Sequence, residues 1–131
     1  MFTYRLFTFV LFLAVFTGCS SQPAFVDNGN PGQIKVVVYY DENHNSVMDT
    51  NESGTQAKLG ISQDISCPPG NQEKITWILT EVNGIGLFED LKPGKYCVVI
   101  SNGFSMTTKM TQEVYVSSDQ EHLVRFGVIR P

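Results

Sequence analysis

Short runs in which hydrophobic residues alternate with polar ones fill most of the chain after residue 33. The first run, Ile34 to Tyr40, is rich in β-branched and aromatic residues, which favour strands. Turn-forming proline, glycine and asparagine residues separate the later runs, and no run has convincing helical periodicity. The pattern predicts about seven strands in an all-β sandwich: 34–40, 59–67, 74–80, the neighbourhood of Phe88 and Leu91, 95–101, 107–116 and 122–129.

The run from 74 to 80 carries the only tryptophan of the chain. Strand alternation places Ile75, Trp77 and Leu79 on one face. The two aliphatic neighbours favour a core position for Trp77, and the alternative is an exposed platform that stacks on sugar rings.

The first residues have the pattern of a targeting signal. Arg5 precedes a largely apolar run of eleven residues, 6–16, which is too short to span a bilayer core of about 30 Å as a helix. The run ends in Thr17-Gly18-Cys19, which resembles the lipobox of bacterial lipoproteins. That resemblance implies cleavage before Cys19 and lipid on its thiol, and Ser20 after it implies sorting to the outer membrane in a two-membrane host. The alternative is a plain secretory signal with a chance cysteine.

The composition then divides the chain into three parts. Residues 1–18 are the expected signal peptide, and 19–32 are a lipidated cysteine with a flexible tether rich in Ser, Pro, Gly and Asn. Residues 33–131 form one β-sandwich domain. Loss of Arg5 leaves 8 of the 9 basic residues against 13 acidic ones, so the mature chain has a formal charge of −5. This charge argues against nucleic acid and against electrostatic binding to anionic lipid, and leaves the lipid anchor as the membrane contact.

The remaining two of the three cysteines are Cys67 and Cys97. In an oxidising compartment an even pair predicts a disulfide that closes a loop of about 30 residues. The alternative is two inert thiols in the core.

Residues 41–52 (DENHNSVMDTNE) have the spacing of a 12-residue calcium loop. Oxygen-bearing side chains fall at positions 1, 3, 5, 9 and 12, and a carbonyl is available at position 7. The residue at position 6, Ser46, stands where glycine usually provides a positive φ. A strand precedes the loop, which excludes an ordinary EF-hand, and the alternative is a solvated acidic turn. The predicted calcium ligands are Asp41, Asn43, Asn45, Val47, Asp49 and Glu52.

Two blocks of residues resemble the B-type domain of serine-aspartate repeat surface proteins, within the prealbumin-like and collagen-adhesin B-type group. The first is the calcium loop with Gly54 after it, in register with DxNxDGxxDxxExG. The second, in register with NGxYxFxxLxPGxYxV, has Gly86 in place of the first tyrosine and consists of Asn83, Gly84, Phe88, Leu91, Pro93, Gly94, Tyr96 and Val98. The resemblance implies a Greek-key, Ig-like sandwich with structural calcium.

No catalytic motif emerges, because neither His44 nor His122 lies in a nucleophile motif. We therefore expect a non-catalytic, calcium-binding surface lipoprotein with a structural or interaction role in the cell envelope, and a protein or glycan of the envelope as partner. One alternative is a module that binds glycan or peptide, which an exposed row of Trp77, Tyr39 and Tyr115 would favour. Another is an accessory domain of a peptidase.

Overall fold

The computed structural model describes residues 24–63 and 66–131, so the expected signal peptide and Cys19 lie outside the described residues. Within the described residues the chain forms eight strands and one short 3-10 helix, η1 (Gln72–Lys74). The strands are β1 (Gly32–Tyr40), β2 (Lys58–Ser62), β3 (Thr76–Leu79), β4 (Ile85–Leu91), β5 (Gly94–Ile100), β6 (Ser105–Met106), β7 (Thr111–Val116) and β8 (Glu121–Ile129).

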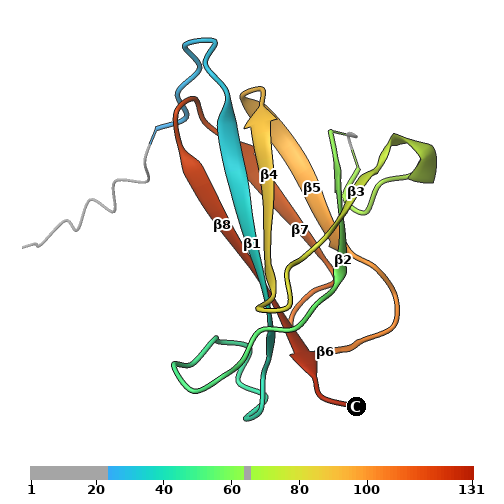
Figure 1. The fold of residues 1–131 in the computed structure, drawn as a ribbon. Helices are drawn as coiled ribbons and strands as arrows, with labels where there is room; N and C mark the ends of the chain where they lie inside the picture. The colour runs from blue at the N-terminus through green and yellow to red at the C-terminus, as the bar shows by residue number, and fades with distance from the viewer. Residues whose placement is uncertain (1–23, 64–65) are drawn as a thin grey trace, which may run out of the picture.

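These strands form two four-stranded sheets that pack as a sandwich (Figure 1). Sheet A has the order β4-β1-β8-β6, and sheet B has the order β3-β2-β5-β7. The all-β sandwich is therefore confirmed, with one strand more than the seven predicted. Of the expected strand 107–116 only residues 111–116 form a strand, β7, and the additional strand is the two-residue β6, which pairs with the end of β8. No helix long and apolar enough to cross a lipid bilayer occurs in the part of the chain that the structure describes.

The first and last strands lie side by side in the middle of sheet A. They run parallel, and their pairing extends without a shift from Gln33 opposite Glu121 to Tyr40 opposite Val128. Parallel neighbours cannot be joined by a tight turn, and here the long connection between them contains β4, β6 and the whole of sheet B. The sandwich is consequently completed only by the end of the sequence.

The main core lies between the sheets, where the inward residues of both sheets meet. Alternation along β1 buries Ile34, Val36 and Val38 completely, as the sequence pattern predicts. Burial of such side chains is worth about 1.5–3 kcal/mol each in transfer free energy. The other buried members are Ala57, Leu59, Ile61, Phe88, Tyr96, Val98, Ile100, Val116, Val124, Phe126 and Val128.

A second, smaller apolar cluster covers the outer face of sheet B. Ile75, Cys97 and Val99 are buried there, and Cys67 and Trp77 pack against them. The cluster fits over β2 because Gly60 has no side chain: a β-carbon there would overlap Ile75. The predicted strand 59–67 ends earlier, at Ser62, because the chain leaves the sheet to form this covering loop.

The described end of the expected tether lies against the turn between β7 and β8. The backbone N–H of Ser118 donates to the Val26 carbonyl (2.8 Å), and the N–H of Asp119 donates to the Pro31 carbonyl (3.1 Å). The Asp119 carboxylate also accepts hydrogen bonds from the side-chain amides of Asn28 and Asn30, each at 3.0 Å. The chain therefore enters β1 from a defined direction at this end of the sandwich.

Candidate metal site

The predicted calcium loop connects β1 with β2 at the end of the sandwich opposite the entering chain, next to the C-terminus (Figure 1). Its two ends are held together by backbone pairing. Tyr39 forms an isolated antiparallel bridge with Gly54, and the N–H of Tyr40 donates to the Ser53 carbonyl at 2.9 Å. The loop is therefore closed at its base by β1 itself rather than by a pair of helices.

The first and last acidic residues of the loop are buried and organise its backbone. Asp41 is 1% exposed, and its two carboxylate oxygens accept hydrogen bonds from the N–H groups of Asn45 (3.0 Å) and Ser46 (2.8 Å). Glu52 is 7% exposed and accepts hydrogen bonds from the N–H groups of Glu42 and Asp49, both at 2.9 Å. The loop thus folds around two carboxylates that a solvated turn would leave exposed.

The other predicted ligands converge on Asp49. One carboxylate oxygen of Asp49 accepts hydrogen bonds from the side-chain amides of Asn43 (2.7 Å) and Asn45 (3.0 Å). The amide oxygen of Asn43 accepts from the N–H of Asn45 (3.1 Å), and that of Asn45 accepts from the N–H of Val47 (2.8 Å). All five predicted side chains are therefore brought together in one hydrogen-bonded loop.

The loop backbone makes the sharp turn that the spacing predicts. Ser46, at the usual glycine position, has a φ of 62°, and His44 has a φ of 57°. His44 is exposed, as expected of a residue that is not a ligand. Ser46 is held in this left-handed conformation partly by its hydroxyl, which donates to the Thr107 carbonyl at 2.7 Å. This bond joins the loop to the segment that follows β6.

The carboxylates of Asp41 and Glu52 lie close to the buried hydroxyl of Tyr39. Burial raises the pKa of Asp41, but the nearby Thr107 hydroxyl and the backbone N–H groups of Ser46 and Asn45 outweigh it and hold the pKa below its usual value. Tyr39 lies nearby with its hydroxyl buried and without a hydrogen-bond partner in the described residues. Burial, followed by the charges of Asp41 and Glu52, raises the pKa of this hydroxyl. The ionised form of the buried Asp41 carboxyl is therefore favoured in the folded protein.

The donor set fits a hard cation that accepts oxygen ligands. In the described residues, no three His, Cys, Asp or Glu side chains could hold a metal by themselves. A cation in the loop would need neutral oxygens from Asn43, Asn45 and the Val47 carbonyl besides the three carboxylates. Calcium takes six to eight oxygens of this mixed kind, whereas zinc prefers nitrogen and sulfur. Rotation of the two asparagine amides would turn their oxygens toward a cation.

Sequence reasoning missed the residue that holds the outer end of the loop. Arg130 donates to the Glu42 carboxylate at 2.9 Å, and its guanidinium lies 4.1 Å from the centre of the Tyr40 ring. Both partners lie at the β1–loop junction, on either side of Asp41 in sequence. The sequence shows only that a basic residue follows the last strand. Its contact with the loop can be inferred only when β8 is known to run parallel to β1, because the two strands then end side by side.

The predicted disulfide is confirmed. Cys67 and Cys97 are bonded, with their α-carbons 5.4 Å apart and a separation of 30 positions in sequence. The bond attaches the loop between β2 and β3 to the outer face of β5. It forms part of the cluster with Trp77, whose ring also lies 5.0 Å from the Lys58 ammonium.

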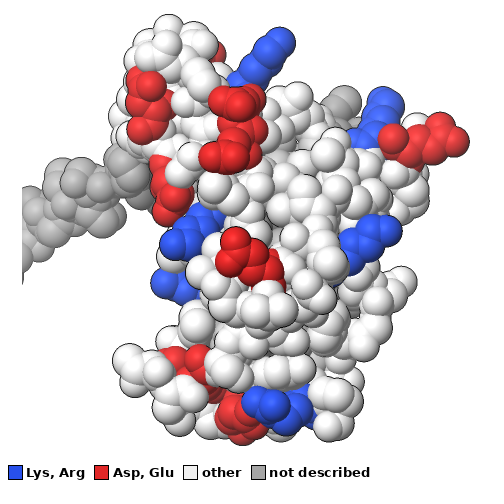
Figure 2. All heavy atoms as spheres, viewed as in Figure 1, with Lys and Arg blue, Asp and Glu red and all other residues white. Residues whose placement is uncertain are grey.

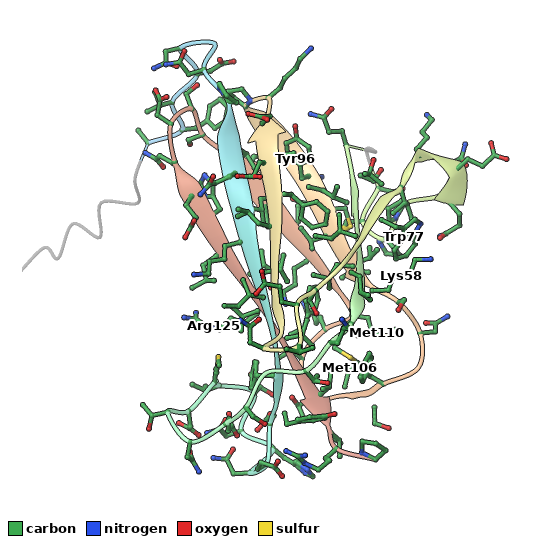
Figure 3. All side chains as sticks on the ribbon, viewed as in Figure 1. Lys58, Trp77, Tyr96, Met106, Met110 and Arg125 are labelled. Atoms are coloured by element: carbon green, nitrogen blue, oxygen red, sulfur yellow. A yellow bond between two sulfur atoms is a disulfide. The ribbon has the colours of Figure 1, made fainter. Side chains whose placement is uncertain are left out.

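The three aromatic residues proposed as a glycan-binding row do not form one. Tyr39 is completely buried, whereas Tyr115 is 58% exposed on β7. Trp77 lies half-buried on β3, at the other edge of sheet B from β7 (Figure 3). The observation that would have favoured a glycan-binding face is therefore missing.

Comparison with known proteins extends only to the fold. No protein-family model matches the chain, and no curated protein sequence matches it significantly. Among solved structures it resembles the TIE protein of Bacillus anthracis (TM-score 0.54, 12% identity, 77% of this chain and 17% of that one). It also resembles GBS52, the minor pilin of Streptococcus agalactiae (TM-score 0.54, 9% identity, 79% of this chain and 46% of that one).

This chain thus spans less than half the length of either of those two proteins. At such low identity the likeness concerns the arrangement of strands and not a shared activity. Within that limit, the chain is an all-β sandwich similar to the prealbumin-like, Ig-like domains of Gram-positive surface and pilin proteins.

Proposed function

We propose that this protein is a non-catalytic, calcium-binding module of the bacterial cell envelope, anchored by lipid on Cys19 and serving a structural or interaction role. The observation that carries the proposal is the loop 41–52, in which Asp41 and Glu52 are buried and Asn43 and Asn45 converge on Asp49. Calcium would bind the three carboxylates together with neutral oxygens and would fix the loop in one conformation.

An extracytoplasmic location is supported by two independent features. Disulfides such as Cys67–Cys97 persist in oxidising compartments. The fold is similar to domains of bacterial surface and pilin proteins. The lipobox-like segment before Cys19 then supplies the attachment, since two or three acyl chains hold a protein stably on a membrane.

The position of the calcium loop relative to the start of β1 supports a role for the loop on the side away from the membrane. The chain enters the sandwich at the start of β1, and the calcium loop begins where β1 ends (Figure 1). Nine residues of strand span about 30 Å. A lipid on Cys19 would therefore place the loop at the membrane-distal end, where a stiff calcium-bound surface could meet a partner.

Calorimetric titration of the purified protein with calcium tests the metal. We expect one binding event with an affinity in the range of extracellular sites, about 10⁻⁴–10⁻³ M, and a higher melting temperature. A hundredfold excess of calcium over Kd would stabilise the native state by about 2.7 kcal/mol.

Asp49→Ala should abolish binding, whereas Asp90→Ala, which changes an exposed aspartate far from the loop, should not. An unchanged melting temperature in calcium and in chelator would contradict the proposal, and so would equal binding by the two variants.

A further inference from the structure

One edge of β8 is only partly used by the sheet. On the side of β1, the Val128 carbonyl accepts from the Asp41 N–H at 2.9 Å, and the pairing continues without a shift to Glu121. Backbone groups of a strand alternate in direction. The N–H and C=O groups of the even-numbered residues of β8 therefore point toward β1, and those of the odd-numbered residues point toward the opposite edge. That other edge faces β6 and the start of β7.

On this edge the backbone groups near the end of β8 are hydrogen-bonded, whereas some in the middle of the strand are not. The Gly127 carbonyl accepts from the Thr107 N–H (3.0 Å), the Gly127 N–H donates to the Thr108 hydroxyl (3.1 Å), and the Arg125 carbonyl accepts from the Gln112 amide (2.6 Å). The N–H of Arg125 and both backbone groups of Leu123 have no hydrogen-bond partner in the described residues. Exposed strand edges of this kind are templates for the addition of another strand.

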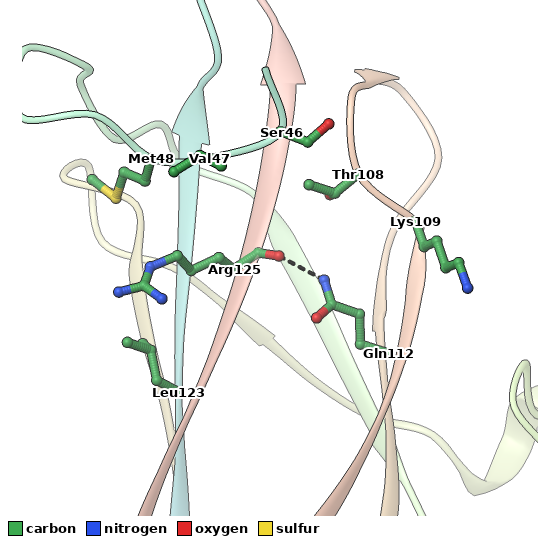
Figure 4. Close-up of a pocket in the computed structure, with 8 residues that line it drawn as sticks. All are labelled: Ser46, Val47, Met48, Thr108, Lys109, Gln112, Leu123 and Arg125. Atoms are coloured by element: carbon green, nitrogen blue, oxygen red, sulfur yellow. Dashed lines mark hydrogen bonds between the residues drawn. The ribbon is translucent and has the colours of Figure 1, made fainter. Parts of the chain in front are cut away.

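A groove of about 640 Å³ runs along the open edge (Figure 4). Its walls come from the calcium loop, from β8, from the segment between β6 and β7, and from the start of β7. The guanidinium of Arg125 lies between the side chains of Met48 and Leu123, as Figure 4 shows. Val47 and Leu123 are 59% and 47% exposed, so the groove offers apolar surface to solvent.

The groove is positively charged in an acidic protein. Lys109 and Arg125 line it, and no aspartate or glutamate does, although the whole chain has a net charge of −4. Neither cation belongs to an ion pair of the described residues, where the two ion pairs are Lys95–Glu113 and Arg130–Glu42. The carboxylates of the calcium loop lie outside the groove lining. A second acidic set, Glu89, Asp90, Asp119 and Glu121, lines a separate hollow at the other end of the sandwich (Figure 2).

We propose that the β8 groove binds an extended, acidic and partly apolar segment of a partner protein by strand addition. The segment would pair with the free backbone groups of Leu123 and Arg125, place a carboxylate on Arg125 or Lys109, and pack apolar side chains on Met48, Val47 and Leu123. The inference rests on the interaction role proposed above, but it depends on neither calcium nor lipid.

Two other occupants fit the groove less well. A second copy that used the same edge in antiparallel pairing would bring two Arg125 side chains close together, and like charges across a strand pair destabilise it. An acidic polysaccharide could meet the two cations, but it has no backbone N–H and C=O groups with the spacing of a strand. An acidic polypeptide uses both the edge and the charge.

The test uses isotope-labelled protein and a synthetic peptide of about six residues, the usual length of a strand, that alternates valine and glutamate. Calcium is held constant throughout. We expect saturable binding, slower hydrogen exchange of the Leu123 and Arg125 amides, and affinity about tenfold lower in Arg125→Glu. Lys92→Glu, the matched reversal at an exposed lysine distant from the groove, should bind like the wild type.

Three further probes are the same peptide with lysine in place of glutamate, an N-methylated version, and polygalacturonate. We expect all three to bind much more weakly. Absence of peptide binding, equal binding by any of these probes, or binding that leaves the Leu123 and Arg125 amides unprotected would overturn the proposal. Self-association that protects those amides without peptide would assign the edge to a second copy instead. Each of these failures would leave the calcium titration unaffected, so the two proposals are judged separately.

Discussion

Gly54 and Asn83 are in direct backbone contact: a β-carbon on Gly54 would overlap the carbonyl group of Asn83. The two residues belong to different motifs, one at the end of the calcium loop and the other at the turn before β4. The chain crosses itself here over β1, where the Val38 N–H donates to Gly84 (2.9 Å) and the Val38 carbonyl accepts from Thr55 (3.0 Å). The two sequence blocks therefore form one packed junction.

This contact predicts that Gly54→Ala destabilises the fold by about 2 kcal/mol, because an added methyl group has no room and the backbone must shift. Urea unfolding of the purified variant measures the change. Gly70→Ala is the control, since a β-carbon on Gly70 would make only an ordinary contact, 3.7 Å from the Ser66 hydroxyl. Equal stability of the two variants would contradict the prediction.

Asn45→Asp should strengthen calcium binding by about tenfold, because affinity of such loops rises with the number of charged ligands. The variant also restores the aspartate of the family pattern at this position. Asn51→Asp adds the same charge at a loop position that is not a ligand and should change the affinity far less. Calorimetric titration measures both, and a similar gain in the two variants would mean that only the overall charge matters.

Removal of the disulfide should lower the free energy of unfolding by about 3–4 kcal/mol, as chain entropy predicts for a loop of this size. Reduction should also change the fluorescence of Trp77, the only tryptophan, because its ring packs in the same cluster as Cys67 and Cys97. Denaturant titrations with and without reductant measure the stability. If intact protein were alkylated at both cysteines without prior reduction, this bond would be absent.

The stability should fall in acid partly through Asp119. Hydrogen bonds from Asn30 and then Asn28 hold the pKa of its carboxyl below the ordinary value of 3.8. The ionised form is therefore favoured in the folded state, and its stabilising contribution is complete above that value and is lost as the pH falls through the lower, folded-state pKa.

Asp119→Asn should weaken this acid dependence in urea unfolding measured at a series of pH values. Asp90→Asn is a matched control, because Asp90 is also exposed, has a similar left-handed backbone (φ 53° against 59°), and accepts no hydrogen bond at its carboxylate from the described residues. An identical acid dependence of the Asp119 variant and the wild type would exclude the contribution.

Cys19→Ser should leave the fold intact and prevent lipid attachment. Cys19 lies outside the described residues, so this prediction rests on the sequence alone. Each buried CH₂ of an acyl chain adds about 0.8 kcal/mol of membrane affinity, so the wild type should partition into detergent and incorporate labelled palmitate in its native host. A wild-type protein that stays in the aqueous phase without label would indicate a freely secreted domain.

The sequence was sufficient for the fold class and for the turn of the loop because both depend on local chemistry. It was sufficient for the disulfide because only Cys67 and Cys97 remain once Cys19 is assigned to lipid. Alternation defined the inward face of β1, and the spacing of the loop oxygens placed Ser46 correctly in a left-handed turn. The Tyr96 hydroxyl donates to the Lys92 carbonyl at 2.9 Å, a bond that lies within the LxPGxY block itself. These features need no knowledge of distant strands.

Expectations that depended on long-range packing were less successful. In the run 74–80 the alternation puts Ile75, Trp77 and Leu79 on the apolar face and leaves Ile78 among polar residues, so it favours the wrong inward face. In the structure Ile78 packs against the main core, Ile75 and Trp77 lie in the outer cluster, and Leu79 is 62% exposed. Gly86 stands where the NGxYxFxxLxPGxYxV pattern has a tyrosine. In the structure the side chains of Leu59, Ile78 and Thr80 already occupy the space beside it.

The parallel pairing of β1 and β8 has a mechanical consequence. The chain enters at the start of β1 and leaves at the end of β8, at opposite ends of the sandwich (Figure 1). Tension between these ends pulls the two strands past one another, so their hydrogen bonds carry the load together instead of opening one at a time. Forced rupture then requires the whole ladder to slide at once, and the domain resists stretching along its own length.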